Sequence, residues 1–94
     1  EEMTIEELTA LAGPDRLGSK HLTALWYDLH GDWDTAHRIV QEMYDSDAEW
    51  IHAYLHRKEP DIGNAKYWYR RSGHPYPGNM PFDEEASAIL SALP

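Results

Sequence analysis

Two histidines and a glutamate stand at a spacing that could serve metal chemistry. His52 and His56 are four residues apart, so on a helix both imidazoles lie on one face, with Glu49 one turn before them. This spacing suits two ligands of one Zn²⁺ ion. The zinc-protease motif needs a glutamate directly after its first histidine, and Ala53 stands there instead. We therefore favour an ordinary solvent-facing helix surface with a weak Glu–His pair, and we assign no metal ligand set and no cofactor.

His37 is a further candidate for proton transfer. On a helix it lies at the margin of the apolar stripe, one turn from Trp33, and Asp32 and Asp34 stand at the start of the same helix. A histidine hydrogen-bonded to an aspartate can act as a general base. However, the chain has no cysteine and no serine in a nucleophile motif. We favour a half-buried histidine held by a backbone carbonyl or an aspartate.

A cationic stretch is the best-motivated binding site in the sequence. The net charge is −9, from 8 Lys+Arg against 17 Asp+Glu, yet five of the eight cations fall within residues 57–71. Forked guanidinium donors beside an aromatic wall suit an anionic group. The alternative is that the arginines pair with carboxylates of the same chain, at Glu49, Glu59 and Asp61. The candidate ligand-binding residues are Arg57, Asn64, Tyr67, Arg70 and Arg71.

Composition limits the class of protein. Ninety-four residues predict one domain spanning residues 1–94, and 41% apolar residues suffice for a modest core. The acidic balance argues against nucleic acid and anionic membranes as partners, and no apolar run is long enough to cross a bilayer. The absence of cysteine suits a reducing compartment, so we expect a cytoplasmic protein that is a monomer or a homodimer.

The elements that would position these residues are helices. Apolar residues recur at helical spacing along most of the chain, and no stretch alternates as a strand would. The predicted helices cover residues 5–12, 20–30, 33–44, 48–58, 62–72 and 84–93. Their predicted first caps are Thr4 in a capping box with Glu7, then Ser19, Asp32, Asp47 and Asp61, and Asp83 starts the last helix.

The chain also resembles itself at an offset of 29 residues. Residues 22–43 align without a gap on residues 51–72, with small residue on small residue and acid on acid. Self-similarity of this kind indicates stacked helical units that cannot bury their apolar faces alone. We expect two helical hairpins, with Ala36 and Ala65 buried where helices cross, and end helices covering the exposed apolar faces.

Residues 24–36, with a small residue, an aromatic pair and a Gly-Asp-Trp-Asp turn before an alanine, resemble the centre of a tetratricopeptide repeat. The fold that this implies is all-α, with two tetratricopeptide-like hairpins between N- and C-terminal capping helices. The segments Gly-Asp-Trp-Asp-x-Ala-His at 31–37 and Asn-Ala-x-Tyr-Trp-Tyr-Arg-Arg at 64–71 also resemble a group of small uncharacterised bacterial proteins. That resemblance implies no reaction and no ligand.

Two functions remain open on the sequence alone. The favoured one is a non-enzymatic interaction module that binds a peptide or a small anionic ligand in a groove lined by residues 48–72. The alternative is a small metal-dependent or acid/base hydrolase using His37, His52 and His56 with carboxylate partners. Whether these histidines converge in one place decides between the two, and the sequence leaves that question open.

Overall fold

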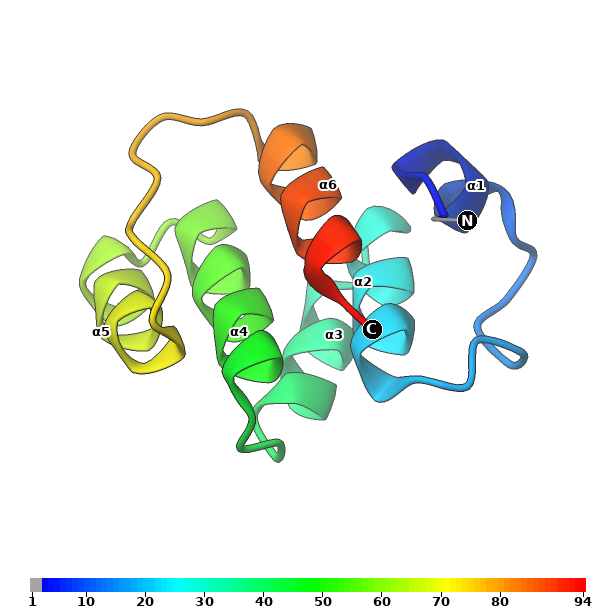
Figure 1. Cartoon of the computed structure of the whole chain (residues 1–94), viewed down its shortest axis with the longest axis horizontal. Coiled ribbons are helices and arrows are strands. Elements are labelled where there is room, and N and C mark those ends of the chain that lie inside the picture. Colours follow the sequence, from blue (N-terminus) through cyan, green and yellow to red (C-terminus); the bar gives the residue numbers. More distant parts are fainter. Residues whose placement is uncertain (1–2) are drawn as a thin grey trace.

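The computed structural model describes residues 3–94 and contains six helices in that range (Figure 1). The first two residues of the predicted domain lie outside the described residues. The prediction of an all-α fold is confirmed, and no strand occurs within the described part of the chain. The helices are α1 (Ile5–Ala10), α2 (Lys20–Leu29), α3 (Trp33–Val40), α4 (Ser46–Lys58), α5 (Ile62–Ser72) and α6 (Phe82–Ala92).

Local sequence signals start most of these helices where predicted. The Thr4 hydroxyl and the Glu7 carboxylate form the reciprocal bonds of a capping box at α1. Side chains of Ser19, Asp32 and Asp61 accept the expected backbone bonds at α2, α3 and α5. Each cap satisfies a backbone N–H that would otherwise lack a partner, which stabilises a helix by about 1 kcal/mol.

Four predicted boundaries are wrong by two or more residues, and the first is the end of α1, at Ala10 instead of residue 12. Asp45 rather than Asp47 caps α4, with its carboxylate accepting from the Ala48 N–H at 3.1 Å, which leaves Asp47 in the first turn. Helix α6 begins at Phe82 and so includes Asp83 in its first turn. Helix α3 ends at Val40 instead of continuing to residue 44, and Tyr44 is 85% exposed beyond it.

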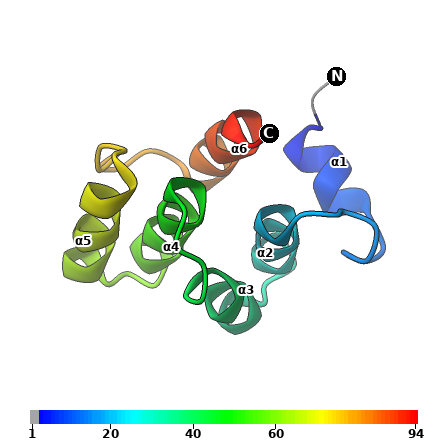
Figure 2. The same cartoon turned by 60° about the horizontal axis from the view of Figure 1, so that its bottom comes forward.

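The helices pack as two adjacent pairs covered by the first and last helices. Helices α2 and α3 form one pair and α4 and α5 the other, and α3 lies against α4 to join them (Figure 2). Helix α6 packs on α4 and meets α1, which in turn contacts α2. The hairpins expected from the 29-residue offset are therefore present, with the terminal helices packed on them.

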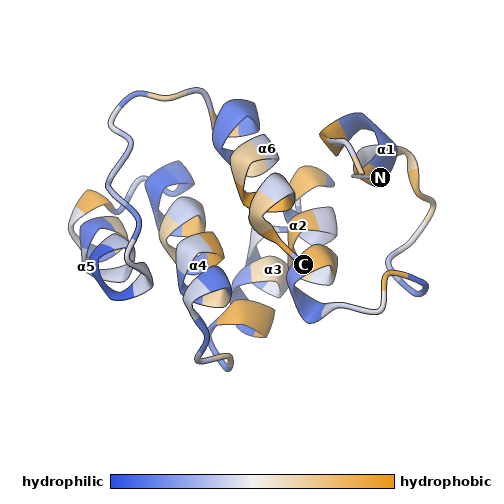
Figure 3. Cartoon of the chain, in the orientation of Figure 1, coloured by the Kyte–Doolittle hydropathy of each residue, from blue (hydrophilic) through white to orange (hydrophobic). Residues whose placement is uncertain are grey.

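The apolar core is divided unequally between the pairs. The main core joins residues of α1, α2, α3, α4 and α6, whereas a smaller one holds Ala53, Ala65 and Tyr69 between α4 and α5. Ala36 and Ala65 have no exposed surface, as predicted. Figure 3 shows the difference, because α2 and α6 carry much of the hydrophobic colour whereas α5 is largely hydrophilic. None of the described helices has the length and apolar character needed to span a membrane.

Candidate functional site

The predicted cationic site is dispersed in the structure. Arg57 is buried, and its Nε and Nη2 atoms donate to one oxygen of Glu85 at 2.9 and 2.8 Å. Its Nη1 atom donates to the carbonyls of Gly78 and Met80 at 3.2 and 2.9 Å. Arg57 thus serves to join α4 to the start of α6, and its donors are directed into the protein.

The other four candidates lie on α5. Arg71 donates from Nε to Glu49 at 3.2 Å and from Nη1 to the Tyr67 hydroxyl at 3.3 Å. This is the internal pairing that the sequence left open as the alternative. Arg70 is exposed, with no ion pair among residues 3–94. Asn64 faces a different neighbour, because its amide nitrogen lies 3.4 Å from His56 Nε2.

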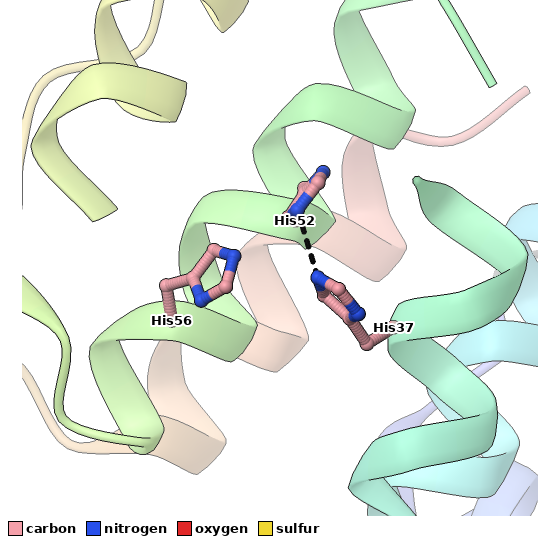
Figure 4. A group of neighbouring side chains, drawn as sticks. All are labelled: His37, His52 and His56. Carbon is pink, nitrogen blue, oxygen red and sulfur yellow. Dashed lines mark hydrogen bonds between the residues drawn. The ribbon is translucent and has the colours of Figure 1, made fainter. Parts of the chain in front are cut away.

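The three candidate histidines, in contrast, come together. His37 reaches from α3 toward His52 and His56 on α4, and each offers a ring nitrogen such that the three atoms lie within 4.8 Å of one another (Figure 4). The Nε2 atoms of His37 and His52 are 3.1 Å apart. We call these three residues the histidine cluster.

Local structure explains why His37 arrives at this place. The Asp32 cap starts α3 at Trp33, so the indole and the imidazole of His37 lie one turn apart on the same face. The Trp33 indole N–H donates to the carbonyl of Leu55 on α4 at 2.7 Å. This bond fixes α3 against α4 at the level where His52 and His56 project.

Tryptophan rings form the walls of the cluster. Trp33 stacks on His37 with ring centroids 4.8 Å apart, and Trp68 of α5 stacks on His52 at 4.0 Å. His52 and His56 are each only 5% exposed, and His37 is half-buried. The favoured prediction of a solvent-facing surface is therefore wrong, because α3 and α5 cover that face of α4. Glu49 is also buried, and it pairs with Arg71 rather than with a histidine.

Burial keeps two of the imidazoles neutral. Removal from water, together with the neighbouring imidazoles, lowers the pKa of His52 from 6.5 to about 3. The pKa of His37 is also lowered, first by burial and then by His56, against the opposing effect of Glu59 and Asp34. A neutral imidazole has a lone pair on one ring nitrogen, so both residues can accept a hydrogen bond or bind a metal ion near neutral pH.

A carboxylate fixes the orientation of the third imidazole. The Nδ1 atom of His56 lies 2.7 Å from Glu59 Oε1, and an ionised carboxylate only accepts, so the Nδ1–H group donates a hydrogen bond to it. The Nε2 atom then carries the lone pair, which meets only the long contact from the Asn64 amide. A carboxylate behind a ligating histidine is the usual arrangement at protein metal sites, where it holds the ring and increases its basicity.

The separations suit one small metal ion. A tetrahedral Zn²⁺ ion with Zn–N bonds of about 2.0–2.1 Å separates its nitrogen ligands by about 3.3–3.4 Å. The Nε2 atoms of His37 and His52 are 3.1 Å apart, which is close to that value. The ring nitrogen of His56 lies within 4.8 Å of the ligand nitrogens of the other two histidines. Three-fold ligation therefore requires the ring nitrogen of His56 to come no more than 4.8 Å from the other two, which the structure already provides.

The predictions about individual residues missed the roles of Glu59, Trp33 and Trp68 at this cluster. One signal pointed to it: in stacked helical hairpins the second helix of one pair lies against the first helix of the next. His37 stands on the former and His52 on the latter.

No family of known proteins, no curated protein and no solved structure matches this chain, so the resemblance to tetratricopeptide repeats stays a prediction.

Proposed function

We propose that this protein is a small helical metal-binding protein, in which His37, His52 and His56 hold one divalent transition-metal ion. The observation that carries the proposal is the convergence of three ring nitrogens within 4.8 Å at the junction of α3 and α4. Helix α3 supplies His37 and helix α4 supplies His52 and His56, which stand 15 and 19 residues after His37 in the chain. A bound ion would then join the two helical pairs.

The donor set indicates which ions to expect. Imidazole nitrogen suits Zn²⁺, Cu²⁺, Ni²⁺ and Co²⁺, whereas Mg²⁺ and Ca²⁺ prefer oxygen ligands. Because His37 and His52 are neutral near pH 7, binding there requires no loss of a proton from either ring. The Glu59 carboxylate supports the third ligand from behind. These features together favour a site for zinc or copper over one for an alkaline-earth ion.

Thermal unfolding with and without Zn²⁺ tests the proposal. A ligand that binds only the folded state at 100 times its dissociation constant stabilises it by about 2.7 kcal/mol, which raises Tm by roughly 10–20 °C in a domain of this size. His52→Ala should abolish the rise, whereas His30→Ala, which changes an exposed histidine of α2's C-terminal cap, should keep it. An unchanged Tm in the parent protein with excess Zn²⁺ would contradict the proposal.

The interaction module expected from the sequence is a second candidate, and one observation favours it. Arg71 and Tyr67 lie side by side on α5, with 48% of the Arg71 side chain and 44% of Tyr67 exposed. Arg70 adds a second exposed cation. Calorimetric titration with inorganic phosphate tests this candidate, because Arg71→Ala should remove the heat of binding if the arginines form an anion site. Binding that survives Arg71→Ala unchanged would argue against it.

A further inference from the structure

We infer that the metal ion held by the histidine cluster keeps one coordination position open, and that this position takes water or a small monodentate anion. The inference rests on the proposed function and adds to it the chemical class of the ligand. It follows from the number of protein ligands, from what covers the cluster and from the charge that the ion would bring.

The protein supplies three ligands and no fourth. Within residues 3–94, the group of converging ligand atoms contains three imidazoles, and no aspartate or glutamate joins it. Glu59 and Asp61 lie near His56 in a separate group, and Glu59 is bonded to Nδ1, the nitrogen that faces away from the proposed ion. The chain has no cysteine. Zinc takes four ligands in most protein sites, and sites with three protein ligands hold water or substrate at the fourth position.

The surroundings favour a ligand of a few atoms. Trp33 and Trp68 stack on two of the three imidazoles, which leaves their ring faces unavailable to a bulky molecule. Four of the surface hollows, with volumes of about 330–610 Å³, are lined by other residues. His37 is half-buried and so leaves the cluster partly accessible to solvent. Small solutes can reach the ion there, and none of these four hollows adjoins it to hold a large substrate.

Charge decides between an anion and a neutral ligand. Three imidazoles bring no negative charge, so the ion would keep its full double charge in a poorly solvated place. Glu59 and Asp61 are grouped around His56, and Asp34 acts on His37 from α3, but all three carboxylates are exposed and none of them joins the three imidazoles as a ligand. Water screens exposed carboxylates, so a small anion bound directly to the ion compensates its charge more closely than they do.

Cobalt substitution tests the inference, because the visible absorption of Co²⁺ reports its coordination. We expect one equivalent of Co²⁺ to give the absorption of a four-coordinate site, and sodium azide to shift these bands saturably. Equilibrium dialysis should show that cobalt stays bound at one equivalent during the azide titration. The variant His30→Ala serves as a matched control, since it changes an exposed histidine outside the cluster and should keep both the one-equivalent cobalt binding and the azide shift.

Each other outcome overturns a defined part of the account. Co²⁺ bound at one equivalent with bands that azide does not move means that the protein fills the fourth position, which overturns this inference and leaves the metal site intact. Cobalt released by azide means that the anion competes for the ion, which also overturns it. Failure of Co²⁺ to bind at all, while the protein is folded, overturns the proposed function together with this inference.

Discussion

Helix α4 carries two buried polar clusters whose chemistry differs. One is the Glu85 cluster, in which Glu85 accepts from Arg57, from the Trp50 indole at 3.1 Å and from the Tyr69 hydroxyl at 2.6 Å. The other is the histidine cluster on the neighbouring face. In the Glu85 cluster a full positive charge meets a full negative charge, and both carboxylate oxygens accept two donors each.

The histidine cluster lacks this balance. It gathers three bases, and the pKa values of His37 and His52 are lowered first by burial and then by the neighbouring imidazoles. The ring nitrogens that face one another are held by weak contacts, at 3.1 Å between His37 and His52 and at 3.4 Å between His56 and the Asn64 amide. The comparison teaches that burial alone does not distinguish a structural cluster from a binding site. The first cluster pairs opposite charges within the protein, whereas the second, in our proposal, is completed by a cation.

The largest effect should come from breaking the Glu85 cluster. Glu85→Ala leaves Arg57 buried without a counter-charge, which should lower the free energy of unfolding by about 3–5 kcal/mol in urea denaturation. Glu84→Ala alters the exposed neighbour on the same helix and should change the free energy of unfolding by less than about 0.5 kcal/mol. Equal losses in the two variants would show that the pair does not hold α6 on α4.

Acid should weaken the histidine cluster. The folded pKa of His52 lies below its ordinary value of 6.5, so the unfolded chain binds the proton first. Stability is therefore complete above pH 6.5 and falls as the pH drops toward 3, by about 1.4 kcal/mol per pH unit for one such imidazole. Urea denaturation between pH 7 and 5 measures this slope in the metal-free protein.

The variant His52→Leu isolates that slope. It removes the titrating group and keeps an apolar side chain of similar bulk beside Trp68, so the loss of stability below pH 6.5 should become shallower. The variant His30→Ala should keep the parent slope, because it changes an exposed ring. A slope that His52→Leu leaves unchanged would mean that other groups cause the acid sensitivity.

A smaller effect should follow from crowding the contact between α4 and α5. Ala65 has no exposed surface in the small core with Ala53 and Tyr69. Ala65→Leu should overpack this contact and lower the free energy of unfolding by about 1–3 kcal/mol. Arg70→Leu, at an exposed position of the same helix, should change it by less than about 0.5 kcal/mol. A tolerated Ala65→Leu would show that the contact between α4 and α5 is loose.

The pair of Arg71 and Glu49 gives the last comparison, because Glu49 is buried whereas 48% of the Arg71 side chain is exposed. Solvent weakens the pair from the Arg71 side, so Arg71→Ala should shift the midpoint of urea denaturation less than Glu85→Ala does, and added salt should reduce the difference. A loss of stability as large as that of Glu85→Ala would mean that the pair of Arg71 and Glu49 stabilises the fold as much as the buried pair of Arg57 and Glu85.

Features encoded by neighbouring residues were predictable from the sequence. The capping side chains at Thr4, Ser19, Asp32 and Asp61 and the left-handed Gly31 and Gly73 after α2 and α5 follow from local backbone chemistry. Local rules were insufficient at residues 45–47, where two aspartates two positions apart both suit a cap. They also overextended α3, because Met43 continues the apolar period beyond the last helical residue.

Features that depend on distant residues were not predictable in this way. Arg57 finds its counter-charge 28 residues later, on α6, and no spacing rule links the two. The burial of His52 requires Trp68 of α5 on one side and His37 of α3 on the other. The helical projection placed His52 and His56 on one face of their helix, yet it carried no information about what packs on that face.

The most direct test of the metal site is to observe every imidazole nitrogen during a Zn²⁺ titration, using long-range ¹H–¹⁵N spectra of the folded protein. The chain has six histidines, three of them in the histidine cluster. The account predicts that one equivalent of Zn²⁺ shifts one ring nitrogen in each of these three and leaves His21, His30 and His74 unchanged. Shifts at fewer than three cluster histidines, or equal shifts at the other three, would contradict it.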